Sequence, residues 1–275
     1  MPSPIDPTTA RKVWRTLEPY HGMIYFVPEA AEAYAGLGIT GRSGYFASRA
    51  APMGAVSAEV VVATFFNFNP EVVHAAIPGA WQTATPSAIV DARFAAADAA
   101  LRRVLGDAVE SPEMAEAAGL AAEAARAACC DGRPLAAAHA ALPWPDDDHL
   151  VLWHATSVLR EHRGDGHIAA LTLAGASGIQ ALVMHAASGD VPRGILQSTR
   201  AWSDDAWDEA LDDLVARGWA ERDGSFTAEG RVARAEIEAS TDRAAAAPWG
   251  AIGDDGIARL RELARPWSKA LVGVL

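Results

Sequence analysis

Residues 203–249 read SDDAWDEALDDLVARGWAERDGSFTAEGRVARAEIEASTDRAAAAPW and contain the clearest structural signals in the chain. Ser203 is a good N-cap for a helix that runs to Arg217. Asp223-Gly224 favours a two-residue turn, so we predict a small β-hairpin between this helix and the next. The next helix is expected over residues 227–244. This region therefore has the order helix, hairpin, helix.

The rest of the chain has a helical pattern almost throughout, and strand-like alternation is nearly absent. After Gly189 the sequence pattern changes from long alanine-rich helical segments to shorter segments separated by turn residues. We therefore predict a helical ligand-binding-type region over 1–189 and a second unit over 190–275. Similar Pro-containing segments at 51–54 and 142–145 each precede an apolar helix. This echo fits two half-bundles of similar plan, and chance in an alanine-rich chain explains it equally well.

Residues 211–249 resemble the C-terminal half of a MarR-like winged helix, and a helix over 195–199 completes the order of a winged helix-turn-helix. Nearly the whole chain resembles an actinobacterial helix-turn-helix family. The segments that carry this wider resemblance are HGMIYFVPEA (21–30), GYFASRAAPMG (44–54), FFNFNP (65–70) and LREHRGDGHIAAL (159–171). The resemblance implies a mainly α fold, with an N-terminal helical bundle followed by a MarR-like winged helix. It implies no chemistry and names no cofactor.

Composition excludes several classes of protein. The chain has 275 residues, a net charge of -12 and 51% hydrophobic residues, which is typical of a globular protein. No secretory signal and no run of about 20 apolar residues is present, so we expect no membrane partner and a cytoplasmic location. The adjacent Cys129 and Cys130 are expected to be free thiols in a reducing compartment.

The charge distribution disfavours DNA as a partner, although the winged helix would suggest it. An outward face that enters the major groove needs basic or neutral polar side chains. Here residues 204–213 present a series of carboxylates, each of which repels the phosphate backbone. Arg193, Arg200, Arg222, Arg231 and Arg234 can still form a basic rim beside the wing. We expect that the module serves instead as an element for packing or for forming a homodimer.

The stretch 159–171 is unusual because ionisable residues lie between two apolar helical runs. His162 and Asp165 are three residues apart on a helix, so they can share a hydrogen bond that fixes an imidazole tautomer. Gly164 and Gly166 suggest a kink or a close approach by another group. The candidate catalytic residues are accordingly His162, Asp165 and His167.

Three interpretations of this stretch remain open at this point. It can be a buried ion-pair network in which Glu161 pairs with Arg160 or Arg163, a ligand-binding pocket, or a metal or catalytic site. The spacing of His162 and His167 departs from the i,i+4 pair of helical zinc sites. We therefore predict no metal site.

Arg42, Tyr45, Phe46 and Arg49 alternate cationic and aromatic groups along one helix. This pattern suits an anionic aromatic ligand, and it suits cation–π packing within the protein equally well. The residues expected to line a ligand pocket are His21, Arg42, Tyr45, Arg49, His154, Arg160, Glu161, His162, Arg163, Asp165 and His167.

The leading hypothesis is a helical protein that binds a small molecule and whose winged helix no longer reads DNA conventionally. The second is a MarR-like transcriptional regulator that responds to a ligand. The third is an enzyme in which His162 is the base, Asp165 orients it, and an arginine holds an anionic substrate.

Overall fold

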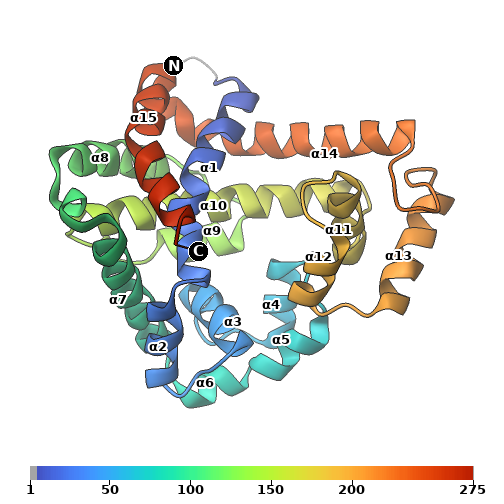
Figure 1. Cartoon of the computed structure of the whole chain (residues 1–275), viewed down its shortest axis with the longest axis horizontal. Coiled ribbons are helices and arrows are strands. Elements are labelled where there is room, and N and C mark those ends of the chain that lie inside the picture. The colour runs from blue at the N-terminus through green and yellow to red at the C-terminus, as the bar shows by residue number, and fades with distance from the viewer. Residues whose placement is uncertain (1–4, 275) are drawn as a thin grey trace.

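The structure, a computed structural model, describes residues 5–274, and within that range the chain is helical with no β-strand (Figure 1). This confirms the prediction of a mainly α fold. The α-helices are α1 (Pro7–Gly22), α2 (Pro28–Gly36), α3 (Arg42–Ala50), α4 (Ala58–Phe65), α5 (Pro70–Ala76), α6 (Gly79–Thr83), α7 (Pro86–Leu105), α8 (Pro112–Arg126), α9 (Pro134–Ala140), α10 (Asp148–Leu173), α11 (Gly178–Ala187), α12 (Arg193–Arg200), α13 (Asp204–Ala216), α14 (Ala228–Ala246) and α15 (Gly253–Val272). Short 3₁₀ turns are η1 (Met23–Tyr25), η2 (Ala51–Met53), η3 (Gly106–Glu110) and η4 (Ala247–Ala251).

Local sequence explains where many of these helices begin. Ser111 is followed by proline, and its side chain accepts a hydrogen bond from the backbone N–H of Met114. Ser177 and Gln180 form a reciprocal capping box at the start of α11. The side chains of Ser203 and Thr227 cap α13 and α14, each by accepting one hydrogen bond from a backbone N–H of its helix. These caps satisfy N–H groups that have no partner inside the helix.

The 26-residue helix α10 crosses the middle of the molecule, where it packs against α1, α8, α9 and α14 (Figure 1). It is continuous, so the interruption expected near Gly164 and Gly166 is not present. The expected close approach is present instead. A Cβ added at Gly166 would lie 2.7 Å from Arg133 Nη1 and 3.1 Å from the Ala244 side chain. Glycine at this position therefore lets Arg133 and α14 approach the helix.

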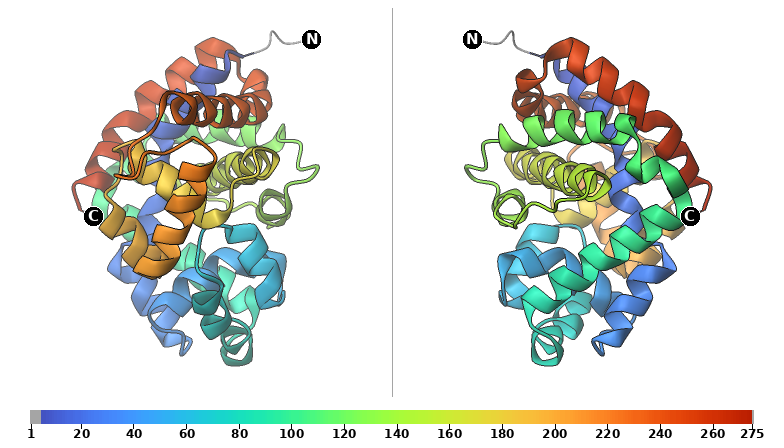
Figure 2. Two further views of the ribbon diagram at one scale, coloured as in Figure 1. Left: turned by 90° about the vertical axis from the view of Figure 1, so that its right-hand side faces the viewer. Right: turned by 90° about the vertical axis from the view of Figure 1, so that its left-hand side faces the viewer.

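Two hydrophobic cores divide the molecule. The first combines residues between 5 and 159 with Trp249 and the buried face of α15, and the second lies between residues 170 and 237. Helix α15 thus returns from the C-terminal end to pack on α1 and α8 (Figure 2). The domain boundary at residue 190 stays a prediction. In the structure, α11 packs with α12 and α13, which follow that boundary, and α15 packs with the N-terminal bundle.

The internal echo does not correspond to two half-bundles. The apolar segment after residue 54 forms the 8-residue α4, whereas the one after residue 145 forms the 26-residue α10. Members of both segments belong to one hydrophobic core. The similarity between them is therefore a property of an alanine-rich composition.

Helix α12, a short turn through Ala201 (φ 59°) and α13 lie where the sequence predicts a helix-turn-helix, and we use that name for this segment. The predicted β-hairpin is reduced to a turn at Asp223-Gly224 with a single isolated antiparallel bridge between Ala220 and Phe226. The Glu221 N–H donates to the Ser225 carbonyl and the Thr227 N–H to the Trp219 carbonyl, and the pairing ends there because Thr227 is already the N-cap of α14.

In residues 5–274 no individual helix has the length and hydropathy needed to cross a bilayer, and α10 with α11 meets that test only as a pair bent by 98°.

Candidate functional site

Glu161 is the centre of a buried ion network. Its side chain has no solvent exposure and accepts two hydrogen bonds from Arg49, from Nε at 2.9 Å and from Nη2 at 2.7 Å. Arg160 Nη1 lies 2.9 Å from the same carboxylate. Burial opposes ionisation, but the Arg160 and Arg49 cations outweigh it and hold the pKa of Glu161 well below its ordinary value. The carboxylate therefore holds α3 and α10 together and positions both arginines.

His162 and Asp165 do not form the predicted pair, and no hydrogen bond joins them in the part of the chain that the structure describes. His162 Nε2 lies 3.1 Å from the carbonyl of Cys129. Asp165 Oδ2 instead accepts the backbone N–H groups of Leu135 at 3.1 Å and Ala136 at 2.9 Å. The two side chains leave α10 toward different neighbours. The enzyme hypothesis thus loses the hydrogen bond on which it rested.

Burial shifts the pKa of each of these groups. It lowers the pKa of His162 to about 4 and raises that of Asp165 to about 6. His167 also has a pKa lowered to about 4 by burial, and its Nδ1 lies 2.9 Å from Thr241 Oγ1. A neutral imidazole with a fixed partner is typical of a structural histidine.

His21 and His154 lie in the core of the bundle. His21 bonds Ser157 at 2.9 Å and Tyr25 at 3.1 Å, which satisfies both ring nitrogens. His154 packs against the rings of Phe94 and Trp144. Neither histidine reaches the two large cavities described next.

Those cavities adjoin each other between the bundle and the helix-turn-helix. The first, of about 470 Å³, is lined by aromatic side chains from η1 and the residue after it, from α3 and from the α4–α5 connection, and we call it the aromatic cavity. The second, of about 450 Å³, lies between α10, α11 and α14 and includes His167 and His185, so we call it the histidine cavity. The residues common to both linings are Tyr45, Phe68, Arg160 and Arg200.

The structure brings together part of the predicted set. Arg42, Tyr45 and Arg160 line the aromatic cavity. The predicted residues that line the histidine cavity are Tyr45, Arg49, Arg160, Arg163, Asp165 and His167. Four predicted residues line neither of these cavities, namely His21, His154, Glu161 and His162. Among them, Glu161 still acts on the site because it holds Arg49 and Arg160.

The aromatic cavity is electropositive. Arg42, Arg160 and Arg200 line it, and Glu18 is the one carboxylate in its described lining. Burial raises the pKa of Glu18, which weakens its ability to balance the arginines. This excess of positive charge in a half-enclosed space favours an anion.

Arg200 is the least satisfied of these arginines. Its Nη1 bonds the Thr199 hydroxyl at 3.0 Å, and its guanidinium lies 4.8 Å above the Phe68 ring. Its Nε is buried and has no hydrogen-bond partner in residues 5–274. Burial lowers the pKa of Arg200, and no carboxylate within residues 5–274 pairs with it to compensate for the lost hydration. A ligand anion would supply the missing partner.

Sequence reasoning missed several members of this site. From the sequence, Arg200 is assigned to a basic rim, and Tyr25, Phe26 and Phe68 have no predicted role in the site. The alternation of arginine and aromatic residues over 42–49 is the sequence signal that corresponds to the cationic and aromatic lining. Arg200 has no such signal, because α12 reaches the cavity only through the way it packs on the bundle.

The outward face of α13 is acidic, as predicted. Asp204, Asp205, Asp208, Glu209, Asp212 and Asp213 are all exposed. Arg193 is engaged by this face, at 3.1 Å from Asp204 and 2.9 Å from Asp208. The expected basic rim is therefore reduced, because Arg193 is paired and Arg200 and Arg234 line cavities.

A comparison with models of protein families finds a match to one described as a helix-turn-helix family, over residues 10–274. No curated protein and no solved structure matches the chain.

Proposed function

The chain belongs to a helix-turn-helix family, and from that premise we propose that it binds a small organic anion in the adjoining cavities between its bundle and its helix-turn-helix. The observation that carries the proposal is the shared lining of Tyr45, Phe68, Arg160 and Arg200, which combines aromatic faces with positive charge. Cavities of this size are typical of sites for small molecules.

The lining also indicates the shape of the ligand. Phe26 and Val272 line the aromatic cavity yet remain 70% and 58% exposed, so an apolar body placed there would cover apolar surface. The acidic group would lie at the junction of the two cavities, where Arg160 and Arg200 converge. The expected ligand is therefore an aromatic or otherwise apolar molecule with a carboxylate, sulfonate or phosphate group.

A thermal-shift screen tests the proposal with aromatic carboxylates, sulfonates and phosphates, each beside its neutral amide or alcohol. We expect at least one anion to stabilise the protein more than its neutral counterpart does. A ligand at about 100 times its Kd adds about 2.7 kcal/mol to the free energy of unfolding.

The variant Arg200→Met should abolish that shift and keep the fold, because Arg200 makes no ion pair with the residues that the structure describes (5–274). Arg259→Met is the matched control, since Arg259 pairs with Glu116 on the far surface and lines neither large cavity. A screen in which no anion exceeds its neutral counterpart would contradict the proposal, and so would a shift that survives in Arg200→Met.

A second candidate is a MarR-like regulator in which the ligand alters DNA binding. Thr199 and Arg200 line the aromatic cavity and belong to α12, the first helix of the helix-turn-helix. A ligand there would contact the module directly. The acidic face of α13 opposes conventional reading of the major groove. Mobility shifts with genomic fragments at low salt distinguish the candidates, since tight and sequence-selective binding would favour the regulator.

A further inference from the structure

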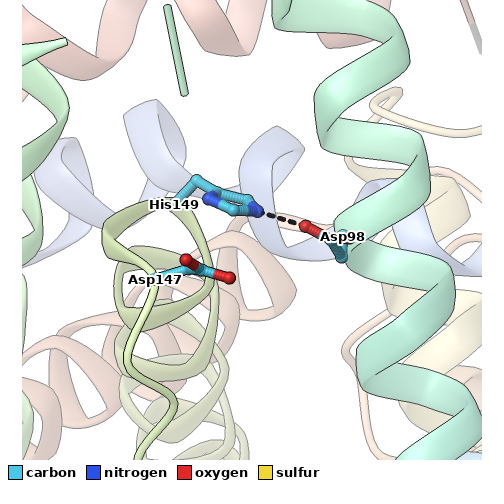
Figure 3. Close-up of side chains that lie close together, drawn as sticks. All are labelled: Asp98, Asp147 and His149. Carbon is cyan, nitrogen blue, oxygen red and sulfur yellow. Dashed lines mark hydrogen bonds and ion pairs between the residues drawn. The ribbon is translucent and has the colours of Figure 1, made fainter. Parts of the chain in front are cut away.

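A separate cluster of ligating side chains lies where α10 begins, and none of its residues lines either large cavity. Asp98 comes from α7, while Asp147 and His149 come from the N-terminal end of α10 (Figure 3). One ligand atom from each of the three residues can be chosen so that all lie within 4.8 Å of one another. The three side chains converge from two helices on one small volume (Figure 3).

We propose that Asp98, Asp147 and His149 bind a divalent transition-metal ion such as Zn²⁺. One imidazole and two carboxylates form a donor set that suits zinc, and water would complete the coordination. The proposal is independent of the organic anion proposed above, because it involves different residues in a different place.

The imidazole is already held in position. His149 is 1% exposed, and its Nε2 is directed at Asp98, with 2.6 Å between that nitrogen and Oδ1. A ligand fixed by burial loses little side-chain entropy when a metal binds. In the metal-bound form Nε2 would carry no proton and coordinate the ion: a neutral imidazole would carry its proton on Nδ1 instead, and an imidazolium would release one proton to solvent.

Within residues 5–274, Asp147 differs from most polar N-caps and resembles Ser57 at the N-cap of α4, whose side chain also makes no capping hydrogen bond. Asp147 occupies the N-cap of α10, but its side chain makes no capping hydrogen bond. Ser111, Ser177, Ser203 and Thr227 all make one at the equivalent position. The Asp147 carboxylate is directed to the cluster instead, where it lies close to the imidazole of His149 (Figure 3).

The local charges leave room for a cation. Arg102 contacts three carboxylates, at 2.7 Å from Asp98, 3.3 Å from Glu110 and 3.7 Å from Asp147. One guanidinium does not neutralise them, so an excess of negative charge remains. Arg102 is 40% exposed and can turn toward solvent. It therefore acts as a counterion that a divalent ion would displace.

The test uses the full chain after removal of metals by chelation. Zn²⁺, Mn²⁺, Mg²⁺ and Ca²⁺ are each titrated while Tm is measured, and Co²⁺ is titrated while its visible absorption is recorded. We expect a saturable rise in Tm with Zn²⁺ and d–d absorption bands with Co²⁺. Asp147→Asn should weaken both at least about tenfold, since loss of a ligand is at least as severe as loss of a group that orients one.

Arg102→Gln is the decisive second variant, because a metal site predicts tighter Zn²⁺ binding in this variant and a plain ion-pair network does not. It should tighten Zn²⁺ binding several-fold, since it removes the competing cation. Glu116→Gln is the matched control for an exposed acid in an ion pair, and it should change nothing.

Four outcomes would overturn the proposal. They are no saturable Tm shift with Zn²⁺, binding that Asp147→Asn leaves unchanged, weaker binding in Arg102→Gln, and an equal response to Mg²⁺ or Ca²⁺, which would indicate oxygen ligands alone.

Discussion

Helices α10 and α13 both carry series of charged residues, but the protein places these charges in opposite environments. Glu161 on α10 has no exposed side-chain surface and is paired with two arginines. Asp204 on α13 has a side chain that is 83% exposed and makes one contact with Arg193. The same residue chemistry therefore joins helices in one region and covers a solvated face in the other.

The difference teaches which charges matter for stability. A buried carboxylate is tolerated only with cations and hydrogen bonds around it, so each partner depends on the others. An exposed carboxylate keeps most of its hydration, and its ion pairs contribute little. Substitutions that remove a charge without changing the size of the side chain should therefore lower the free energy of unfolding much more on α10 than on α13.

The largest effect is expected for Glu161→Gln. This variant leaves the buried Arg49 without its carboxylate and the partly buried Arg160 with only Glu18, which should lower the free energy of unfolding by about 3–5 kcal/mol. Urea denaturation measures the change. Glu209→Gln is the matched control on the exposed face of α13. Equal losses in the free energy of unfolding of the two variants would contradict the contrast between α10 and α13.

The ionisation of Asp165 should make a smaller contribution to the free energy of unfolding, and this contribution depends on pH. Burial raises its pKa from 3.8 to about 6, so between these values the folded state binds more protons than the unfolded state. Stability should therefore fall as pH rises from about 4 to about 6, by up to about 3 kcal/mol, and then level off.

Asp165→Asn should remove this fall, because asparagine does not titrate and can still accept an N–H from α9. Denaturation curves at several pH values compare the two proteins. If they show parallel pH profiles between 4 and 6, Asp165 is not the group responsible.

The smallest effect is expected on α13. Replacing Asp205, Glu209 and Asp212 by their amides should change the free energy of unfolding by no more than about 0.5 kcal/mol per site, because the side chains are exposed. Thermal and urea denaturation measure it. A loss of several kcal/mol would mean that this face is covered in the folded protein.

Much of the fold follows from local signals. Proline after a capping residue predicts where α7 and α8 begin, and alanine-rich periodicity predicts the helices themselves. The turn at Asp223-Gly224 is also predicted, but its hairpin is not extended because α14 begins immediately after Phe226. Local propensity predicts the turn and the helix separately, and it does not show that the start of α14 limits the length of the hairpin.

The candidate site was only partly predictable. The pattern of Arg42, Tyr45 and Arg49 indicates a cationic aromatic face, and these residues do line the cavities. Asp165 was paired with His162 from their spacing, whereas it binds the N-terminus of α9. Helical spacing says which residues can meet on one helix, and it does not include the neighbours that compete for them.

By itself, the sequence determined that this protein is helical, that it contains a helix-turn-helix and that α13 has an acidic outward face. These properties depend on neighbours within a few residues, so periodicity and capping suffice. Only the tertiary structure decided that Arg200 and Arg160 line the same two cavities, and that Asp98 contacts His149. Those contacts join helices far apart in sequence, and they form because burial of the apolar faces fixes how the helices pack.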